Sequence, residues 1–562
     1  MAVQPMLPFG EEPMPVVAPP AEGPRLIAEL ARICRQYPLD EKVLVAPSLP
    51  VGHQILERLA RERHPWVNLR VETVRTLAHG LVGADLAREG LRLLSRAQAL
   101  ALVEQACGEA LEPASYFGAL RDRPGFHRAV HGTFDELRAA GISPAALPSR
   151  AFADPRKRRE LKAILARYDE ALVEGRFVDT AEVLRRAVEA ASSAKPDGGP
   201  AVYLVPEGLE LAAVERRLLE SVAGTRLAVL ATDPPEDWTR NAPAAQIFRA
   251  IGEENELREA FRRILAGGIA FDEAEILHTD AATYPALAWE LASEHGIPCT
   301  FSGGVGAPFT RPGQAALAFL NWVGQGFSAD VLREALASGA LTFQRMPGAG
   351  ADAPGARAAA RSFRDARIGW GARRHVTCLD RLAAELEKDD GRAQRDEASE
   401  EEIAVSRQRR ARRLAAAQRA RDFAARAVAL SAEAARETCD LRALASGCRT
   451  FVTEFARASD ELDGMALAAV QRLLEELEIL SGSRLPPAEA AERLADAVRA
   501  LAVGADRPRP GRLHVADYRA GGYSGRPHTF LLGLDEARHP GTDLEDPVLL
   551  DDERRSINRI LA

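Results

Sequence analysis

Several motifs are missing from this chain of 562 residues, and each absence excludes a class of protein. A phosphate-binding P-loop reads GxxxxGK[ST], but no Gly-Lys pair occurs anywhere, so we do not expect ATP hydrolysis by such a loop. No run of 18 apolar residues occurs, which argues against a membrane span. Lysine is rare, and because alanine, glycine and proline are abundant, we attribute this skew to a GC-rich genome rather than to function.

Cysteine is sparse as well. The six cysteines form no CxxC pair, so we expect isolated buried thiols in a reducing cytoplasm. No cysteine follows Cys448, so an iron–sulfur cluster near the end of this sequence would have no ligands. Residues 1–24 are rich in proline and lack a basic segment followed by an apolar one, which indicates a disordered leader rather than a signal peptide. We therefore predict a cytoplasmic protein.

The bulk composition bounds the organisation of the chain. Its length exceeds what one hydrophobic core can serve, so about two to four domains are expected. Apolar residues make up 46% and charged residues 27% of the sequence, which fits a globular protein. Because the net charge is −8, any contact with nucleic acid must be local rather than spread over the whole surface.

The hydrophobic pattern predicts α/β structure in the first part of the chain, interrupted by helices. Residues 91–190 are helical by pattern, and 192–200 are typical of a linker. Strands are expected at 43–46, 68–72, 201–205 and 226–232, and helices at 26–36, 55–63 and 211–222.

A second α/β unit is predicted from about residue 255 onward. Residues 314–502 are again mostly helical, with a Gly/Ala loop at 347–356. Strands are expected at 275–278, 298–301, 513–517 and 529–533, and helices at 256–266 and 284–295. Two sheet domains, each split by a helical excursion, would produce this order of elements.

The junction at 43–60 is predicted to be a strand, a loop and a helix, which is where a P-loop would lie. The stretch 47–54 keeps only Gly52, with His53 in the place of lysine and Gln54 in the place of serine or threonine. His53 and Gln54 could still touch a phosphate, because a helix N-terminus attracts anions. Without the lysine and the hydroxyl, we favour a degenerate loop that only joins strand to helix.

Two segments resemble motifs of the UvrD-like superfamily 1 helicases. The segment VETVRTLAHGLV (71–82) is similar to the Thr-Phe-His-Ser-Leu-Ala segment that contacts single-stranded DNA in that family, with Arg75 replacing histidine. Residues 202–222 resemble the strand that carries the metal-binding Asp-Glu pair, but Pro206 replaces the aspartate. Since Glu207 has lost its partner, we expect a surface carboxylate rather than a general base.

Other segments resemble the AddB-type subunit of AddAB helicase–nucleases. These are 252–265, 271–309 and 513–541, although the Lys-Gly-Leu-Glu core of the last is replaced by Gly521, Gly522, Tyr523 and Ser524. Residues 548–558 resemble the start of the family's final motif. AddB-type subunits also carry a C-terminal PD-(D/E)XK nuclease domain with an iron–sulfur cluster, and this sequence ends where that domain should begin.

The resemblance implies a fold and a set of domain bounds. The fold would be α/β, with two RecA-like parallel-sheet domains of UvrD type, each interrupted by a mostly helical insertion. The expected parts are a leader at 1–24, a first RecA-like domain at 25–90 and 196–250 with its insertion at 91–195, and a second at 251–320 and 503–562 with its insertion at 321–502.

A nuclease site elsewhere in the chain is not indicated. A two-metal nuclease needs carboxylates for Mg²⁺ and a lysine that positions water, in the pattern (D/E)-x-K. Only Asp40-Glu41-Lys42, in a turn before a strand, and Glu160-Leu161-Lys162, in a helical pattern, match it. We predict no catalytic residue and no metal ligand in this chain.

Three residues are candidates for contact with DNA: Thr73, Arg75 and Thr76. Hydroxyl and guanidinium groups beyond a strand end could grip phosphates, although an ordinary polar turn is the alternative. The arginine-rich segment 406–421 spreads its charges around a helix, so a solvated face is favoured there. Few aromatic residues lie near either site, and base stacking is not indicated.

The leading hypothesis is a catalytically silent, helicase-like subunit of an AddAB-type complex for double-strand-break repair and recombination. It would hold single-stranded or duplex-end DNA while an AddA-like helicase–nuclease partner binds ATP and Mg²⁺, and it would need no cofactor of its own. One alternative is the N-terminal part of a longer ATP-dependent helicase–exonuclease whose PD-(D/E)XK domain is missing. Another is a helical interaction scaffold without a DNA role.

Overall fold

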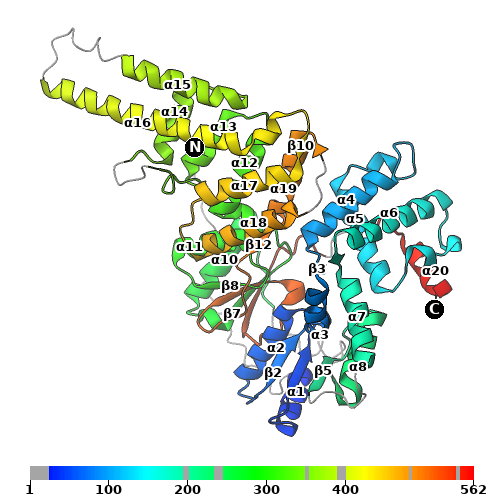
Figure 1. The fold of residues 1–562 in the computed structure, drawn as a ribbon. Coiled ribbons are helices and arrows are strands. Elements are labelled where there is room, and N and C mark those ends of the chain that lie inside the picture. Colours follow the sequence, from blue (N-terminus) through cyan, green and yellow to red (C-terminus); the bar gives the residue numbers. More distant parts are fainter. Residues whose placement is uncertain are drawn as a thin grey trace.

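The fold is described from a computed structural model, which covers residues 24–193, 201–232, 245–347, 353–388, 400–479, 484–539 and 545–561. The expected leader and the linker at 192–200 lie mostly outside these ranges, as does half of the Gly/Ala loop at 347–356. The chain is mixed α/β and contains two four-stranded sheets whose strands all run parallel (Figure 1). The expected α/β class with parallel sheets is therefore confirmed.

The first sheet has the strand order β2-β1-β5-β6. Its strands are β1 (Lys42–Val45), β2 (Leu69–Glu72), β5 (Val202–Pro206) and β6 (Leu227–Leu230). Strand β1 is apolar on both faces because helices cover both. Val43 and Val45 share a core with α3, α7 and α8, whereas Leu44 shares one with α1 and α2. These helices are α1 (Arg25–Gln36), α2 (Leu49–Arg61), α3 (Val74–Glu89), α7 (Thr180–Ser193) and α8 (Ala213–Ala223).

A first helical segment separates β2 from β5 in the chain. Its main elements are β3 (Arg92–Leu93), α4 (Arg96–Ala110), α5 (Pro124–Ala139), α6 (Pro155–Glu174) and β4 (Phe177–Val178). Short 3-10 turns lie at Gly118–Leu120, Pro144–Ala146 and Ser149–Ala151. The helices surround a buried cluster that includes Phe126, Phe134 and Leu161.

The second sheet has the order β14-β7-β13-β8. Its strands are β7 (Ala274–His278), β8 (Cys299–Phe301), β13 (Leu513–Asp517) and β14 (His528–Leu532). Alternate residues give the sheet two unlike faces. Ile276 and Val515 pack against α10 (Glu253–Ala266) and α11 (Tyr284–His295) in an apolar core. Glu275 and His514 alternate with them and are also buried, so the other face is polar but covered.

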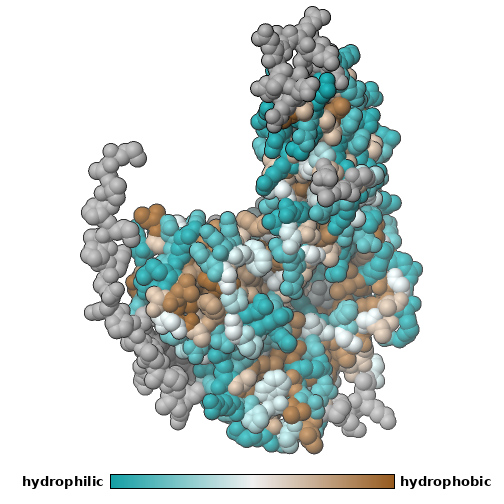
Figure 2. Space-filling view, turned by 90° about the vertical axis from the view of Figure 1, so that its left-hand side faces the viewer, coloured by the Kyte–Doolittle hydropathy of each residue, from teal (hydrophilic) through white to brown (hydrophobic). Residues whose placement is uncertain are grey.

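A second helical segment lies between β8 and β13. Its helices are α12 (Arg311–Gly324), α13 (Ala329–Ser338), α14 (Ala356–Asp365), α15 (Ala372–Lys388), α16 (Glu400–Leu430), α17 (Leu441–Phe455), α18 (Glu461–Glu478) and α19 (Pro487–Arg499). Short strands lie at β9 (Val305–Gly306), β10 (Cys439–Asp440), β11 (Arg484–Leu485) and β12 (Ala502–Val503). Helices α15 and α16 project together from the body as an arm (Figure 1), whose surface is largely hydrophilic (Figure 2).

The last helix, α20 (Asp551–Leu561), lies beside the first helical segment rather than on the second sheet (Figure 1). Lys157 of α6 donates to Glu553 over 2.6 Å, and both side chains are buried. Ile557 is buried as well, and Arg554 pairs with Glu136 of α5 over 3.0 Å. Although 503–562 is expected to belong to the second sheet domain, this helix has its apolar and ionic partners on the first helical segment.

Two further expectations can be compared with the structure. The six cysteines are all unpaired, and five are buried, with Cys299 partly exposed. In the part of the chain that the structure describes, no helix combines the length and the apolar character needed to cross a bilayer.

Candidate functional site at the junction of the two sheets

Helix α2 begins at Leu49, earlier than the predicted 55, so Gly52, His53 and Gln54 lie in a helix and not in a loop. Ser48 caps the helix, because its hydroxyl accepts from the backbone N–H of Val51, and a proline fits the first turn of a helix. The N–H of Gly52 donates to the carbonyl of Ser48 over 3.1 Å. A P-loop uses such N–H groups for phosphate, and here the helix itself uses this one.

Gly52 is the one glycine that residues 47–54 share with the P-loop pattern, and packing explains its presence. A Cβ at this position would overlap Cγ1 of Val71 in β2, and it would also crowd Ala46. The glycine therefore permits close contact between the first turns of α2 and the first sheet. The glycine at position 52 is therefore explained by packing, without a bound phosphate.

Gln54 stands where the Mg²⁺-binding hydroxyl of a P-loop would be, and it connects the two sheets. Its side chain is fully buried. The amide nitrogen donates to the carbonyl of Ala520 over 2.5 Å, and the amide oxygen accepts from the N–H of Tyr523 over 3.2 Å. Both partners lie in the segment between β13 and β14, so one side chain satisfies two backbone groups of the second sheet domain.

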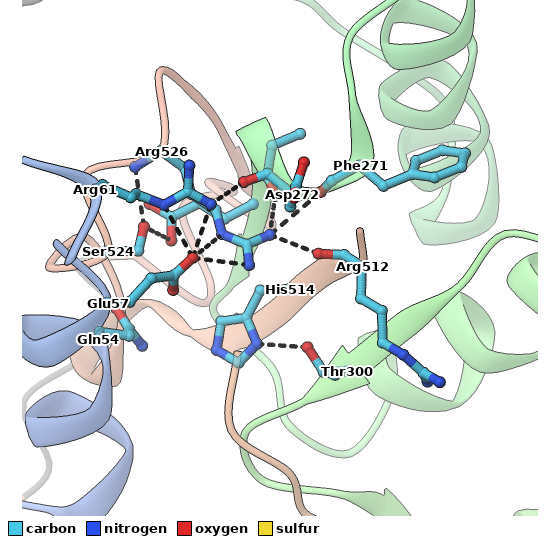
Figure 3. A network of polar contacts seen from close by, with 12 residues as sticks. Gln54, Glu57, Arg61, Phe271, Asp272, Thr300, Arg512, His514, Ser524 and Arg526 are labelled. Carbon is cyan, nitrogen blue, oxygen red and sulfur yellow. Dashed lines mark hydrogen bonds and ion pairs between the residues drawn. The ribbon is translucent and has the colours of Figure 1, made fainter. Parts of the chain in front are cut away.

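A buried arginine continues the junction. The guanidinium of Arg526 has no exposed surface, and it pairs with Glu57 of α2 over 3.1 Å. It also donates to the carbonyls of Ala274 and Arg512, over 2.7 and 2.8 Å. Figure 3 shows Gln54, Glu57 and Arg61 of α2 facing these groups of the second sheet domain.

Arg61 adds a second ionic contact across the junction. It pairs with Glu57 over 2.9 Å and donates to the carbonyl of Asp272, just before β7. Glu57 thus stands between two guanidinium groups, one from each side of the junction. Its half-buried side chain therefore joins the two sides of the junction.

The polar face of the second sheet lies beneath this network. Glu275 accepts from the hydroxyls of Ser524 and Thr529 over 2.7 and 3.0 Å, and burial raises the pKa of its carboxyl. Nδ1 of His514 lies 2.9 Å from the Thr300 hydroxyl. Burial, and then the charge of Arg526, lower the pKa of His514 to about 3, so its imidazole is neutral near pH 7.

Residues 521–524 lie between β7 and α2. A Cβ on Gly521 would overlap the side chain of Leu277 in β7, so only glycine lets the backbone lie this close. Gly522 has a φ of +83°, which glycine adopts without strain. These two glycines bring the backbone of Tyr523 within reach of Gln54.

His53 does not replace the missing lysine as a cation. Burial and the nearby guanidinium of Arg507 both lower the pKa of its imidazole, which is therefore mostly neutral near pH 7.

Glu207 is exposed just beyond β5, and its carboxylate accepts from the N–H of Thr232 over 3.3 Å. Glu207 is therefore a surface carboxylate, as expected.

Thr73 and Thr76, two of the three DNA candidates, form the capping box of α3. The hydroxyl of Thr73 accepts from the N–H of Thr76, and the hydroxyl of Thr76 accepts from the N–H of Thr73. Thr76 also donates to Glu72. Arg75 lies in the first turn of the same helix and is exposed, near Asp135 of α5. Of the three candidates, Arg75 has the side chain most available to a ligand.

In the two tripeptides that match (D/E)-x-K, 40–42 and 160–162, a charged side chain hydrogen-bonds to nearby backbone groups. The ammonium of Lys42 is buried and donates to the carbonyls of Tyr37 and Asp40 over 2.5 and 2.6 Å. Glu160 accepts from the N–H groups of Tyr116 and Phe117 over 2.8 and 2.9 Å. Among the described residues, no group of three or more His, Cys, Asp or Glu side chains is arranged to hold a metal ion.

The arginines of 406–421 lie on α16, as expected, and several are engaged by this chain. Arg413 pairs with Asp365 over 3.2 Å, and Arg421 pairs with Asp380 over 3.0 Å. Arg407, Arg409 and Arg412 are exposed on the outer part of the arm. Some arginines of this segment are therefore paired with α14 and α15, and others face solvent.

Sequence reasoning missed most of the junction, namely Glu57, Ser524 and Arg526. One signal was present: the polar residues Glu275 and His514 interrupt otherwise apolar strands. Such residues indicate a sheet face that is buried under polar groups rather than under a hydrophobic layer.

The fold and the junction define a mixed α/β protein in which a buried polar network ties two parallel sheets together. No protein-family model matches the sequence, and no curated protein matches it either.

Proposed function

We propose that this protein is a helicase-like, DNA-binding subunit of an AddAB-type complex, which holds a DNA strand while an active partner hydrolyses ATP. In this proposal the two sheets belong to RecA-like domains of UvrD type, with helical insertions in both. The motif resemblances at 71–82, 252–265 and 513–541 support the family. The chain then has a passive role, without a nucleotide cycle or nuclease chemistry of its own.

The observation that supports the proposal is that polar side chains of α2, the helix at the position of a P-loop, are bonded to the second sheet domain. A P-loop offers its helix N-terminus and backbone N–H groups to the phosphates. Here Gln54 is bonded to Ala520 and Tyr523, and Glu57 is paired with Arg526. A triphosphate at this helix would find no lysine, and the side chain at the position of the Mg²⁺-binding hydroxyl is already bonded.

DNA is expected along the carboxyl ends of the parallel strands, where ligands bind in open α/β sheets. Arg75 lies there, one turn beyond the end of β2 and exposed. A guanidinium at this position can contact a phosphate, which would position a strand without reading its sequence. The hydroxyls of Thr73 and Thr76 are occupied by the capping box, so their substitution would damage the helix as well.

The test is single-stranded DNA binding by the full chain at low salt, followed by fluorescence anisotropy. We expect binding that is independent of ATP, weakens with salt, and falls about threefold to tenfold in Arg75→Ala. Arg88→Ala is the matched control, because Arg88 is exposed at the far end of the same helix. Equal losses in both variants, or none in either, would remove Arg75 from the DNA path. A chain without DNA binding at low salt would fit the scaffold alternative instead.

A further inference from the structure

Trp370 is the most exposed tryptophan in the described residues, with 71% of its surface accessible. It lies in the turn RIGWG, which connects α14 to α15 at the base of the arm. Ile368, two residues earlier, is buried, with 1% of its surface accessible. One side of the turn therefore packs against the body, and the other side exposes Trp370 to solvent. Large aromatic side chains are usually buried, and an exposed one needs an explanation.

The turn is fixed to the body by backbone hydrogen bonds. The N–H of Gly371 is shared between the carbonyls of Gly326 and Phe327, over 3.1 and 3.2 Å. The N–H of Ala329 donates to the carbonyl of Gly369 over 2.8 Å. Trp370 is thus held from both sides by the connection between α12 and α13.

Two buried side chains, Trp322 and His375, also hold the turn through hydrogen bonds. The indole of Trp322 donates to Nε2 of His375 over 3.1 Å, which leaves Nδ1 to donate to the carbonyl of Gly371 over 3.1 Å. His375 is fully buried, and burial lowers its pKa, so this neutral arrangement holds near pH 7. The position of Trp370 is therefore set by core contacts.

Backbone strain is concentrated in the same place. Phe327 and Arg367 have φ values of +64° and +50°, in the left-handed region that most side chains avoid. Strained residues of this kind persist when the surrounding packing requires them, and they cluster at functional sites. The fold holds Trp370 outward in a fixed position rather than in a mobile loop.

The chain segment that carries Trp370 is strongly basic, although the whole chain is acidic. Residues 353–379 contain six arginines and one acidic residue, Asp365. Asp365 is paired with Arg413 of α16. The six arginines are all exposed: Arg357, Arg361, Arg364, Arg367, Arg373 and Arg374.

The first three of these arginines form a stripe on α14. Arg357, Arg361 and Arg364 follow the i, i+4, i+7 spacing of one helix face, while Ala359, Ala360 and Phe363 are buried on the other. The stripe leads toward the Trp370 turn. Among the described residues, Arg367, Arg373 and Arg374 have no carboxylate within ion-pair distance, so their charges remain available to a ligand.

We propose that Trp370 and its flanking arginines form a second contact for single-stranded nucleic acid, separate from Arg75. One base stacks on the indole, and Arg367, Arg373 and Arg374 hold the adjacent phosphates. An aromatic platform within a basic surface is how proteins bind single strands without sequence preference. This inference rests on the proposed function, that the protein holds DNA, and it adds where a base is gripped.

An anionic membrane would share the charge requirement but not the shape. Interfacial binding scales with the apolar area that enters the lipid, and helices that do this present a whole apolar face. Here Ile368 is buried, so a single indole is presented rather than an apolar patch. One flat ring fits one base better than it fits a bilayer.

The test compares variants of the full chain in binding fluorescein-labelled oligo(dT), measured by anisotropy at low salt. Trp370→Ala should weaken binding about fivefold to 100-fold, which is the range for loss of one stacked base. Trp370→Phe keeps an aromatic face and should retain most of the affinity. Trp66→Ala is the control, because Trp66 is also exposed and lies away from this turn in the chain. The double variant Arg373→Ala/Arg374→Ala should reduce the dependence of binding on salt.

The outcomes of these measurements separate the Trp370 contact from the proposed function. If the wild-type chain binds DNA and Arg75→Ala weakens it while Trp370→Ala does not, this inference is overturned and the proposed function stands. If the wild-type chain does not bind DNA at low salt, both fail together. If Trp370→Ala abolishes binding to vesicles of anionic phospholipid and leaves oligo(dT) binding unchanged, the surface is a membrane contact and the inference is again overturned. The thermal melt of Trp370→Phe shows that the turn still folds.

Discussion

The side chain of Gln54 and the backbone of Tyr523 are 469 positions apart in the sequence, yet the N–H of Tyr523 donates to the Gln54 amide oxygen over 3.2 Å. The same amide donates to Ala520. Gln54 is thus a structural link between the two sheets. We therefore expect the junction to behave as a rigid interface and not as a nucleotide cleft.

Replacing Gln54 should loosen the junction. Gln54→Ala removes both hydrogen bonds and leaves the partly buried carbonyl of Ala520 and the N–H of Tyr523 without this partner, at a total cost of about 1–3 kcal/mol. We expect a lower free energy of unfolding in urea and faster amide hydrogen exchange in 518–526. Gln408→Ala, at an exposed glutamine on α16, should change stability by less than about 0.5 kcal/mol. Unchanged exchange in 518–526 of Gln54→Ala would contradict the structural link.

Two helical glycines should respond in opposite directions to the same substitution. Gly52→Ala places a methyl group against Val71 and should cost about 1–3 kcal/mol through overpacking. Gly80→Ala in α3 meets no atom within 4 Å and should leave stability unchanged or raise it by up to about 1 kcal/mol. Urea denaturation of both variants measures the difference. A Gly52→Ala protein as stable as Gly80→Ala would show that α2 does not pack tightly on β2.

His514 should make stability depend on pH. Its pKa is lowered to about 3 in the folded chain, below its ordinary value near 6.5, so the unfolded chain binds the proton more readily. The contribution is complete above pH 6.5 and is lost as the pH falls toward 3. Measured as wild type minus His514→Asn, the free energy of unfolding should decrease by about 2 kcal/mol between pH 7.5 and 5. A difference that does not vary with pH would mean that the imidazole is not shielded from water.

Much of the secondary structure could be predicted because it is encoded locally. Continuous apolar runs mark β1 and β5, and the helix at 284–295 and the strand at 513–517 have the expected bounds. The predicted start of α2 at 55 is wrong: Ser48 caps the helix and Pro50 lies in its first turn, a pattern typical of a helix start.

The junction could not be predicted from the sequence, for a physical reason. Its hydrogen bonds join α2 to the segment after β13, and no local periodicity relates residue 54 to residue 523. The same limit applies to Trp370. The sequence shows an aromatic residue among arginines, but only the hydrogen bonds from Gly371 to Gly326 and Phe327 reveal that it is held outward.

The most direct test of the central claim is a titration of the purified full chain with a fluorescent ATP analogue and Mg²⁺, with a P-loop ATPase as the positive control. If Gln54, Glu57 and Arg526 close the nucleotide position, the chain shows no saturable binding up to ~1 mM, which corresponds to less than about 4 kcal/mol of binding free energy. Saturable, magnesium-dependent binding at micromolar concentration would contradict the claim and restore a nucleotide cycle to this protein.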